Sequence, residues 1–114
     1  MSQTLSSKER LKQGTEFKSV LERGRRVKKA NLAVWAAPNG LAFNRIGVSA
    51  PRRNFKLASE RNKARRLLKE AYRRNKIKLC RGFDIVIMLK DTAPALSQLE
   101  TGLIGIFADM ELLK

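Results

Sequence analysis

The sequence has no histidine and only one cysteine, Cys80. A single cysteine excludes a disulfide within the chain, and without histidine the usual ligand sets of a structural zinc site are missing. This cysteine usage is typical of proteins of the reducing cytosol, so we expect a cytoplasmic location. General acid–base chemistry would have to depend on carboxylates, lysine or tyrosine.

Long apolar segments and acidic clusters are also missing. Apolar stretches such as Ile85–Leu89 are far too short to span a bilayer, and residues 1–12 lack the apolar core of a signal peptide. Asp84, Asp91 and Asp109 are scattered, and the sequence has no glycine-rich phosphate-binding loop. We therefore expect no membrane attachment, no metal ligands, no tightly bound cofactor and no catalytic residues in this chain.

Positive charge, in contrast, is abundant and concentrated in the middle of the chain. Lys and Arg number 25 against 10 Asp and Glu, a net charge of +15. Residues 52–81 hold 13 basic and 2 acidic residues, whereas residues 82–114 hold 2 basic and 5 acidic ones. Charge of this density costs stability through self-repulsion, and a polyanionic partner is the simplest physical reason to carry it. Nucleic acid is the first candidate, and an acidic membrane surface is the second.

The length and the hydrophobic patterning predict one mixed α/β domain. The chain has 114 residues, of which 43% are hydrophobic, and it contains no internal repeat or long linker. We expect a single domain over residues 1–114, with residues 1–7 as a flexible tail. The patterns predict, in order, a helix carrying Phe17, Val20 and Leu21, a weakly signalled strand near Arg26–Lys28, strands at Asn31–Ala37 and Arg45–Ala50, a helix at Leu57–Lys78, a buried strand at Phe83–Leu89, and a final helix with an apolar stripe from Leu96 to Met110.

The long helix is amphipathic in an unusual way. Its apolar residues cluster on one arc at about 100° per residue, next to a stripe formed by Arg61, Arg65, Lys69 and Arg73 that Asn62 and Arg66 widen. Like charges four residues apart destabilise a helix by a few tenths of a kcal/mol per pair, and guanidinium groups suit bidentate contacts to phosphate. Charged stripes are usually solvated faces, but the scarcity of acids favours a binding surface here.

At these residues the sequence resembles the protein subunit of bacterial ribonuclease P. The resemblance is carried by Arg45–Ser49 (RIGVS), the basic turn Pro51–Asn54 (PRRN), and the helical run Ala58–Arg73 (ASERNKARRLLKEAYR). It extends to Phe17–Gly24 before the first strands and to Phe83–Lys90 before the last helix. Arg65 replaces a usual Lys and Lys69 a usual Arg, so the charge is kept, although Lys69 loses bidentate geometry.

The resemblance implies an α+β fold, a two-layer sandwich like the second domain of ribosomal protein S5. Its element order is helix-strand-strand-strand-helix-strand-helix. It implies a left-handed β-α-β crossover around the long helix, whereas general rules alone favour a right-handed one. It also implies a monomer in a 1:1 complex with a catalytic RNA, which requires Mg²⁺ and removes the 5′ leader from precursor tRNA. The residues implied to contact the catalytic RNA are Arg52, Arg53, Arg61, Asn62, Lys63, Arg65, Arg66, Lys69 and Arg73.

The resemblance further implies a cleft for the single-stranded leader at Phe17, Leu21, Trp35 and Arg65, separate from the basic helix face. Aromatic rings beside a positive groove are a sensible way to hold unpaired bases. Leu21 stands where the family often has a second aromatic residue. From the residues alone, core packing is as good an explanation for Phe17 and Trp35 as base stacking.

Two other functions share the charge and the size of this chain. A structural ribosomal protein would co-sediment with ribosomal subunits rather than with a separate catalytic RNA. An architectural DNA-binding protein would show minor-groove wedges or a basic arm, and neither is evident in the sequence.

Overall fold

A computed structural model describes residues 7–11, 14–29, 31–90 and 95–114. The elements within these ranges are η1 (Ser7–Glu9), α1 (Thr15–Arg23), β1 (Arg25–Lys29), β2 (Leu32–Pro38), β3 (Arg45–Ser49), α2 (Ala58–Asn75), η2 (Lys76–Lys78), β4 (Phe83–Leu89) and α3 (Leu96–Asp109), where η marks a 3-10 helix. This is the predicted order of helices and strands. None of the helices in the described ranges is both long and apolar enough to cross a membrane.

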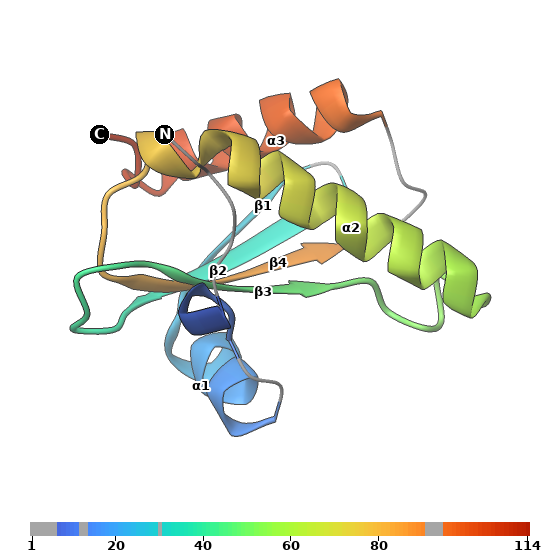
Figure 1. The fold of residues 1–114 in the computed structure, drawn as a ribbon, viewed down its shortest axis with the longest axis horizontal. Helices are drawn as coiled ribbons and strands as arrows, with labels where there is room; N and C mark the ends of the chain where they lie inside the picture. Colours follow the sequence, from blue (N-terminus) through green and yellow to red (C-terminus); the bar gives the residue numbers. More distant parts are fainter. Residues whose placement is uncertain (1–6, 12–13, 30, 91–94) are drawn as a thin grey trace.

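The four strands form one mixed sheet in the order β1-β2-β4-β3. Strands β3 and β4 run parallel, whereas the β1–β2 and β2–β4 pairs are antiparallel. Helices α2 and α3 lie side by side over one face of the sheet, and α1 lies on the other face (Figure 1). With β3 nearest the viewer and α2 above the sheet, the β3–α2–β4 connection is left-handed (Figure 1). The fold is thus the predicted two-layer α+β sandwich, with α1 added on the far side.

The alternation of side chains along β2 explains how two separate apolar clusters form. Leu32, Val34 and Ala36 point toward α2 and α3 and join the main core, whereas Trp35 points toward α1. The main core is closed by fully buried side chains of both helices, including Leu68 from α2. Helix α2 packs against this core with its apolar arc, so the opposite side of the helix faces solvent.

The predicted boundaries differ from the observed ones in small ways. The long helix ends at Asn75, and residues 76–78 form η2 instead of a last α-helical turn. The weakly signalled strand near Arg26–Lys28 exists and is longer, spanning all of β1. Of the predicted flexible tail, Ser7 begins η1 and residues 1–6 lie outside the described residues.

Candidate nucleic-acid interface

The basic face of α2 is positioned by the apolar residues behind it. Ala64, Leu68, Ala71 and Tyr72 are buried against the sheet and α3. Because these residues recur at three- and four-residue intervals, they leave the intervening positions on the outer side of the helix. All of the predicted RNA-contacting residues on α2 are exposed or half-buried there, namely Arg61, Asn62, Lys63, Arg65, Arg66, Lys69 and Arg73.

Two of these arginines already donate hydrogen bonds to backbone carbonyls or to an acid. The Arg61 guanidinium donates hydrogen bonds to the carbonyl oxygens of Phe55 (2.9 Å) and Lys56 (3.2 Å), which ties the helix to the preceding turn. Arg73 makes a two-pronged contact with Glu70 at 2.8 and 2.7 Å. This contact lowers the pKa of the Glu70 carboxyl. Arg61 therefore holds the start of the helix in place, and the charge of Arg73 is balanced by that of Glu70.

Other cations of the predicted surface remain available to an external anion. Five side chains make no hydrogen bond or ion pair within the part of the chain that the structure describes. They are Lys63, Arg66 and Lys69 on α2, and Arg52 and Arg53 in the turn after β3. Arg65 donates a 2.6 Å hydrogen bond to Oδ1 of Asn62, which orients the guanidinium without neutralising its charge. The surface thus presents a row of cations whose hydrogen-bonding capacity is largely unused.

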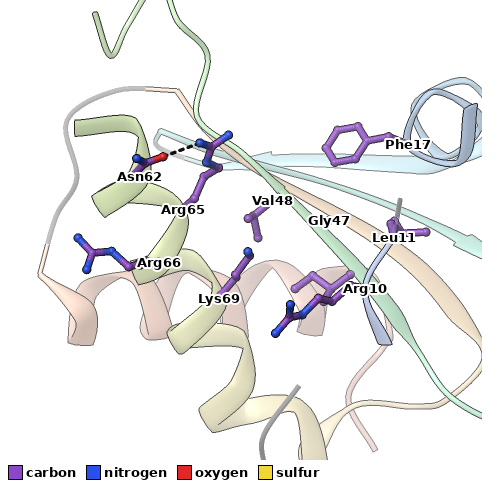
Figure 2. Close-up of a pocket in the computed structure, with 10 residues that line it drawn as sticks. Arg10, Leu11, Phe17, Gly47, Val48, Asn62, Arg65, Arg66 and Lys69 are labelled. Carbon is purple, nitrogen blue, oxygen red and sulfur yellow. Dashed lines mark hydrogen bonds between the residues drawn. The ribbon is translucent and has the colours of Figure 1, made fainter. Parts of the chain in front are cut away.

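A pocket of about 470 Å³ joins this basic face to Phe17 on the other side of β3 (Figure 2). We call it the Phe17 pocket. The side chains of α2 and Phe17 approach it from opposite sides, with Gly47 and Val48 of β3 between them. None of its described lining residues is acidic; they are Arg10, Leu11, Phe17, Ile46, Gly47, Val48, Asn62, Arg65, Arg66 and Lys69. An apolar floor with a cationic rim suits a strand of unpaired nucleotides.

A second pocket, of about 340 Å³, lies against α1 and also contains Phe17 and Arg65. It includes Leu21 and Lys18, and we call it the Leu21 pocket. The two pockets share Val48 as well, so Phe17 stands between them. The structure therefore brings Phe17, Leu21 and Arg65 together as predicted, and it makes the cleft continuous with the basic helix rather than separate from it.

Trp35 lies on the same face of the sheet but lines neither of these pockets. Its ring is half-buried and packs with Leu11, Val20 and Val86. The Arg26 guanidinium lies 5.5 Å from its ring centre, a distance at which a cation is attracted to an aromatic face. In this arrangement Trp35 packs with the cluster beneath α1, apart from the two pockets at Phe17.

Further cations gather where α1 leaves the sheet face uncovered. The pKa of Lys90 is lowered, first by its side-chain contact with Lys28 and then by burial and by the charges of Arg26 and Arg53. Three of the positive groups near Lys90 thus contribute to this shift, so they lie close enough to repel its charge. The basic surface thus extends from α2 across the open part of the sheet.

A partly buried charge network holds α1 in its place beside the Phe17 pocket. The Arg45 guanidinium on β3 donates to both carboxylate oxygens of Asp84 on β4 at 2.8 and 2.7 Å, and to Glu16 on α1 at 3.1 Å. Burial by itself raises the pKa of the Asp84 carboxyl, but hydrogen bonds from Arg45 and Asn39 outweigh it, so the pKa is lowered. The network connects two strands to the helix that carries Phe17.

Sequence reasoning missed two contributors to this site. Gly47 is one, because a Cβ built on it would lie 2.5 Å from Cε2 of Phe17, so that only glycine lets the ring rest on the strand. A glycine inside a strand pattern is a signal of such close approach. Arg10 is the other; it pairs with Ile46 in an isolated parallel bridge and lines the Phe17 pocket. No local pattern in the N-terminal segment indicates that position.

The acidic residues of the described ranges form no group of three or more that could hold a metal ion, with cysteine counted among the candidate ligands. Asp84, Glu70 and Glu100 each face an arginine instead, at 2.7 to 2.8 Å. The residues within the described ranges therefore offer no set of ligands for a protein-bound divalent cation.

Known proteins resemble this chain along most of its length. A family model described as Ribonuclease P matches residues 5–110. The ribonuclease P protein component of Thermotoga maritima is 33% identical over 88 residues, which are 77% of this chain and 74% of that protein. The corresponding protein of Petrotoga mobilis is 38% identical over 86 residues, 75% of this chain and 72% of its own.

Solved structures agree with these sequence matches. The Staphylococcus aureus RNase P protein superposes with a TM-score of 0.81 at 20% identity, over 93% of this chain and 98% of that chain. The RNase P protein from Thermotoga maritima superposes with a TM-score of 0.76 at 27% identity, covering 85% of this chain and 93% of that chain. The family model, the relatives and the shared fold together show that this chain belongs to the bacterial ribonuclease P protein family and is the protein component of that ribonuclease.

Proposed function

We propose that this chain binds the ribonuclease P RNA with the basic face of α2 and holds the 5′ leader of precursor tRNA in the pockets at Phe17. The observation that carries the proposal is the Phe17 pocket, in which cations of α2 and an aromatic ring of α1 meet across β3. Cleavage of the leader then yields the mature 5′ end of the tRNA.

Binding of a structured RNA is supported by the unused cations of α2. Arg66 is exposed, its guanidinium points away from Phe17, and it can donate paired hydrogen bonds to phosphate oxygens (Figure 2). Lys63 and the turn residues Arg52 and Arg53 extend the same surface. Neutralising phosphates with these side chains releases counterions, which supplies affinity without sequence preference. Affinity of this kind suits a structured RNA that is recognised mainly by its folded shape.

Binding of a single strand is supported by the pockets on either side of Phe17. Their floor is apolar, and Arg65, shared by both, lies at the rim with its guanidinium oriented by Asn62. A base can lie against Phe17 while its phosphate meets Arg65. Leu21 offers apolar contact but no ring. The leader is therefore held by one aromatic residue and by charge, with little readout of base identity.

The chemistry is proposed to belong to the RNA, with Mg²⁺ bound there. Two acidic residues that the structure describes near the site support this, because each forms an ion pair with an arginine: Asp84 with Arg45 and Glu70 with Arg73. We further propose a monomer in a 1:1 complex with the RNA, acting in the cytoplasm, and no membrane partner. The chain would then raise the affinity for substrate and lower the Mg²⁺ that cleavage needs.

Reconstitution tests the proposal directly. The protein is added to a bacterial ribonuclease P RNA and a precursor tRNA at low Mg²⁺, and cleavage at the mature 5′ end is measured. We expect strong stimulation over the RNA alone, and an unchanged rate would refute the proposed function. Co-sedimentation of the chain with ribosomal subunits instead of this RNA would favour a ribosomal role.

The leader contact has a separate test. Phe17→Ala should weaken binding of leader-containing tRNA by about tenfold, since stacking on an aromatic ring contributes roughly 1–3 kcal/mol per base. Binding of mature tRNA should hardly change. Circular dichroism checks folding, and loss of the folded state would show instead that the ring is needed in the core.

A further inference from the structure

A third pocket lies at the C-terminal end of α2 and shares no residue with the pockets at Phe17. It encloses about 350 Å³ between η1, the end of α2, η2 and the segment before β3. That volume is within the range of sites that enclose small ligands. We call it the Phe43 pocket, and the proposed contacts of α2 and α1 with RNA leave it unexplained.

Its floor is apolar and partly open to solvent. Ile77 is 52% exposed, unusual for a large aliphatic side chain, and Phe43 beside it is half-buried. Ile77 and Phe43 thus give the pocket an apolar side that is open to solvent.

The rim of the pocket is positive. The Lys8 ammonium lies 5.0 Å from the centre of the Phe43 ring. Arg81 is exposed and makes no hydrogen bond or ion pair within the described ranges. The one acid of the lining, Glu9, is engaged by Lys76 at 3.1 Å, and both side chains are mostly buried. Lys8 and Arg81 thus remain as charges available to an anion.

The polar groups of the floor are already satisfied. Nδ2 of the buried Asn44 donates to the Cys80 carbonyl oxygen at 2.7 Å, and its Oδ1 accepts from the Phe83 amide at 2.8 Å. Tyr72 is buried, and burial raises the pKa of its hydroxyl. Both polar atoms of the Asn44 side chain thus already bond to backbone groups. An occupant would be held mainly by apolar contact and by charge.

We infer that the Phe43 pocket binds an unpaired nucleotide of the RNA partner, its base against Phe43 and Ile77 and its phosphates near Lys8 and Arg81. Sequence-tolerant stacking beside cations is how proteins hold single-stranded segments. A second copy of this chain is a poor occupant, because each copy carries a net charge of +15. The inference rests on the proposed function, in that the RNA is the ribonuclease P RNA.

The position of the pocket supports one continuous RNA footprint. Arg10 lines the Phe17 pocket, and Glu9 and Lys8, directly before it in the chain, line the Phe43 pocket. Arg10 also lines a groove on the outer face of α2 together with Arg66 and Arg73. The short N-terminal segment thus bridges the two regions. An RNA bound along α2 would reach the Phe43 pocket by continuing past Arg73.

Photo-crosslinking in the reconstituted holoenzyme tests the inference. In a Cys80→Ala background, Ile77→Cys is labelled with an azide crosslinker, and Ser97→Cys on the exposed side of α3 is the matched control. Each labelled protein must first stimulate precursor cleavage at low Mg²⁺. A protein without stimulation would count against the proposed function, whereas stimulation without an RNA crosslink would count against the Phe43 pocket alone. We expect an RNA crosslink from position 77 and none from position 97. A crosslink to a second protein chain, or none to RNA, would overturn the inference.

Two further variants separate the charge from the ring. Arg81→Gln should reduce the slope of log affinity against log salt by about 0.7, the value for one phosphate contact on a single strand. Phe43→Leu should lower affinity for the RNA about tenfold without altering that slope. Lys29→Gln, which removes one charge already paired with Asp109 at 2.6 Å, is the control and should change both quantities less. Equal effects from Arg81→Gln and Lys29→Gln would exclude a local contact.

Discussion

Replacing Gly47 with alanine should change both stability and leader binding through one side chain. A Cβ on Gly47 would lie 2.5 Å from Cε2 and 2.8 Å from Cδ2 of Phe17, but 3.5 Å from Cβ of Leu11, an ordinary contact. Carbon atoms pack comfortably at about 3.5–4.0 Å, so the ring must move by roughly 1 Å. No charge is added or removed, and the basic face of α2 is untouched.

The size of the stability change follows from two opposing terms. Overpacking of this kind costs about 1–3 kcal/mol, and exchanging Gly for Ala within a strand regains roughly 0.5–1 kcal/mol. Gly47→Ala should therefore lower the free energy of unfolding by about 1 kcal/mol, taking the middle of both ranges. In a Phe17→Ala background the clash is absent, and the same substitution should stabilise the protein by about 0.5–1 kcal/mol.

Urea denaturation followed by circular dichroism measures this reversal of sign, and binding assays with leader-containing and mature tRNA measure the functional side. Gly47→Ala should weaken leader binding nearly as much as Phe17→Ala, and the double variant no more than either. If the ring swings aside easily, the stability cost shrinks while the binding loss remains. The same stability change in both backgrounds, or unchanged stability together with unchanged leader binding, would refute the reasoning.

Three other predictions concern charged groups. Arg66→Ala should weaken binding to the ribonuclease P RNA by about 1–3 kcal/mol and flatten its salt dependence, and unchanged affinity and slope would remove Arg66 from the interface. Arg61→Ala removes the same charge but also two hydrogen bonds to backbone carbonyls, so it should lower the free energy of unfolding by about 1 kcal/mol, measured by urea titration beside Arg66→Ala. The pKa of Asp84 is lowered in the folded state. Its ion pair with Arg45 therefore contributes full stability above the ordinary aspartate pKa of about 3.9, and this contribution is lost as the pH falls through the lower folded value. Urea midpoints measured from pH 5 downward should fall more steeply for the natural protein than for Asp84→Asn, and parallel curves would show that the pair does not couple to folding.

The order of elements could be predicted because most segments carry their own signal. The apolar run of β4 and the helical periodicity of α2 are visible in the local sequence, and the structure has a strand and a helix at these places. Strand β1 was weakly predicted because four of its five residues are Arg or Lys and only Val27 faces the core. Its strand geometry comes from pairing with β2, which no local propensity encodes.

The candidate site was predicted less completely, because its geometry depends on contacts between distant segments. Helical spacing predicted the basic stripe on α2, and the resemblance gave its RNA contact, but neither shows that Arg61 is engaged by the carbonyl oxygens of Phe55 and Lys56. Arg10 reaches the Phe17 pocket through a bridge to Ile46, 36 positions further along the chain. The resemblance implied a cleft separate from the helix surface, whereas in the structure both pockets at Phe17 also contain Arg65 of α2.

Helices α2 and α3 lie side by side on one face of the sheet, although they carry opposite charge patterns (Figure 1). Contacts such as Arg74 to Glu100 at 2.8 Å join them along their shared border. This pair of helices therefore has an electric dipole whose positive end is the outer edge of α2. In the field of an RNA this dipole turns the protein before contact, so that most encounters begin with the correct edge. Association should consequently be fast at low ionic strength and should slow as salt screens the field, even where the final complex is unchanged.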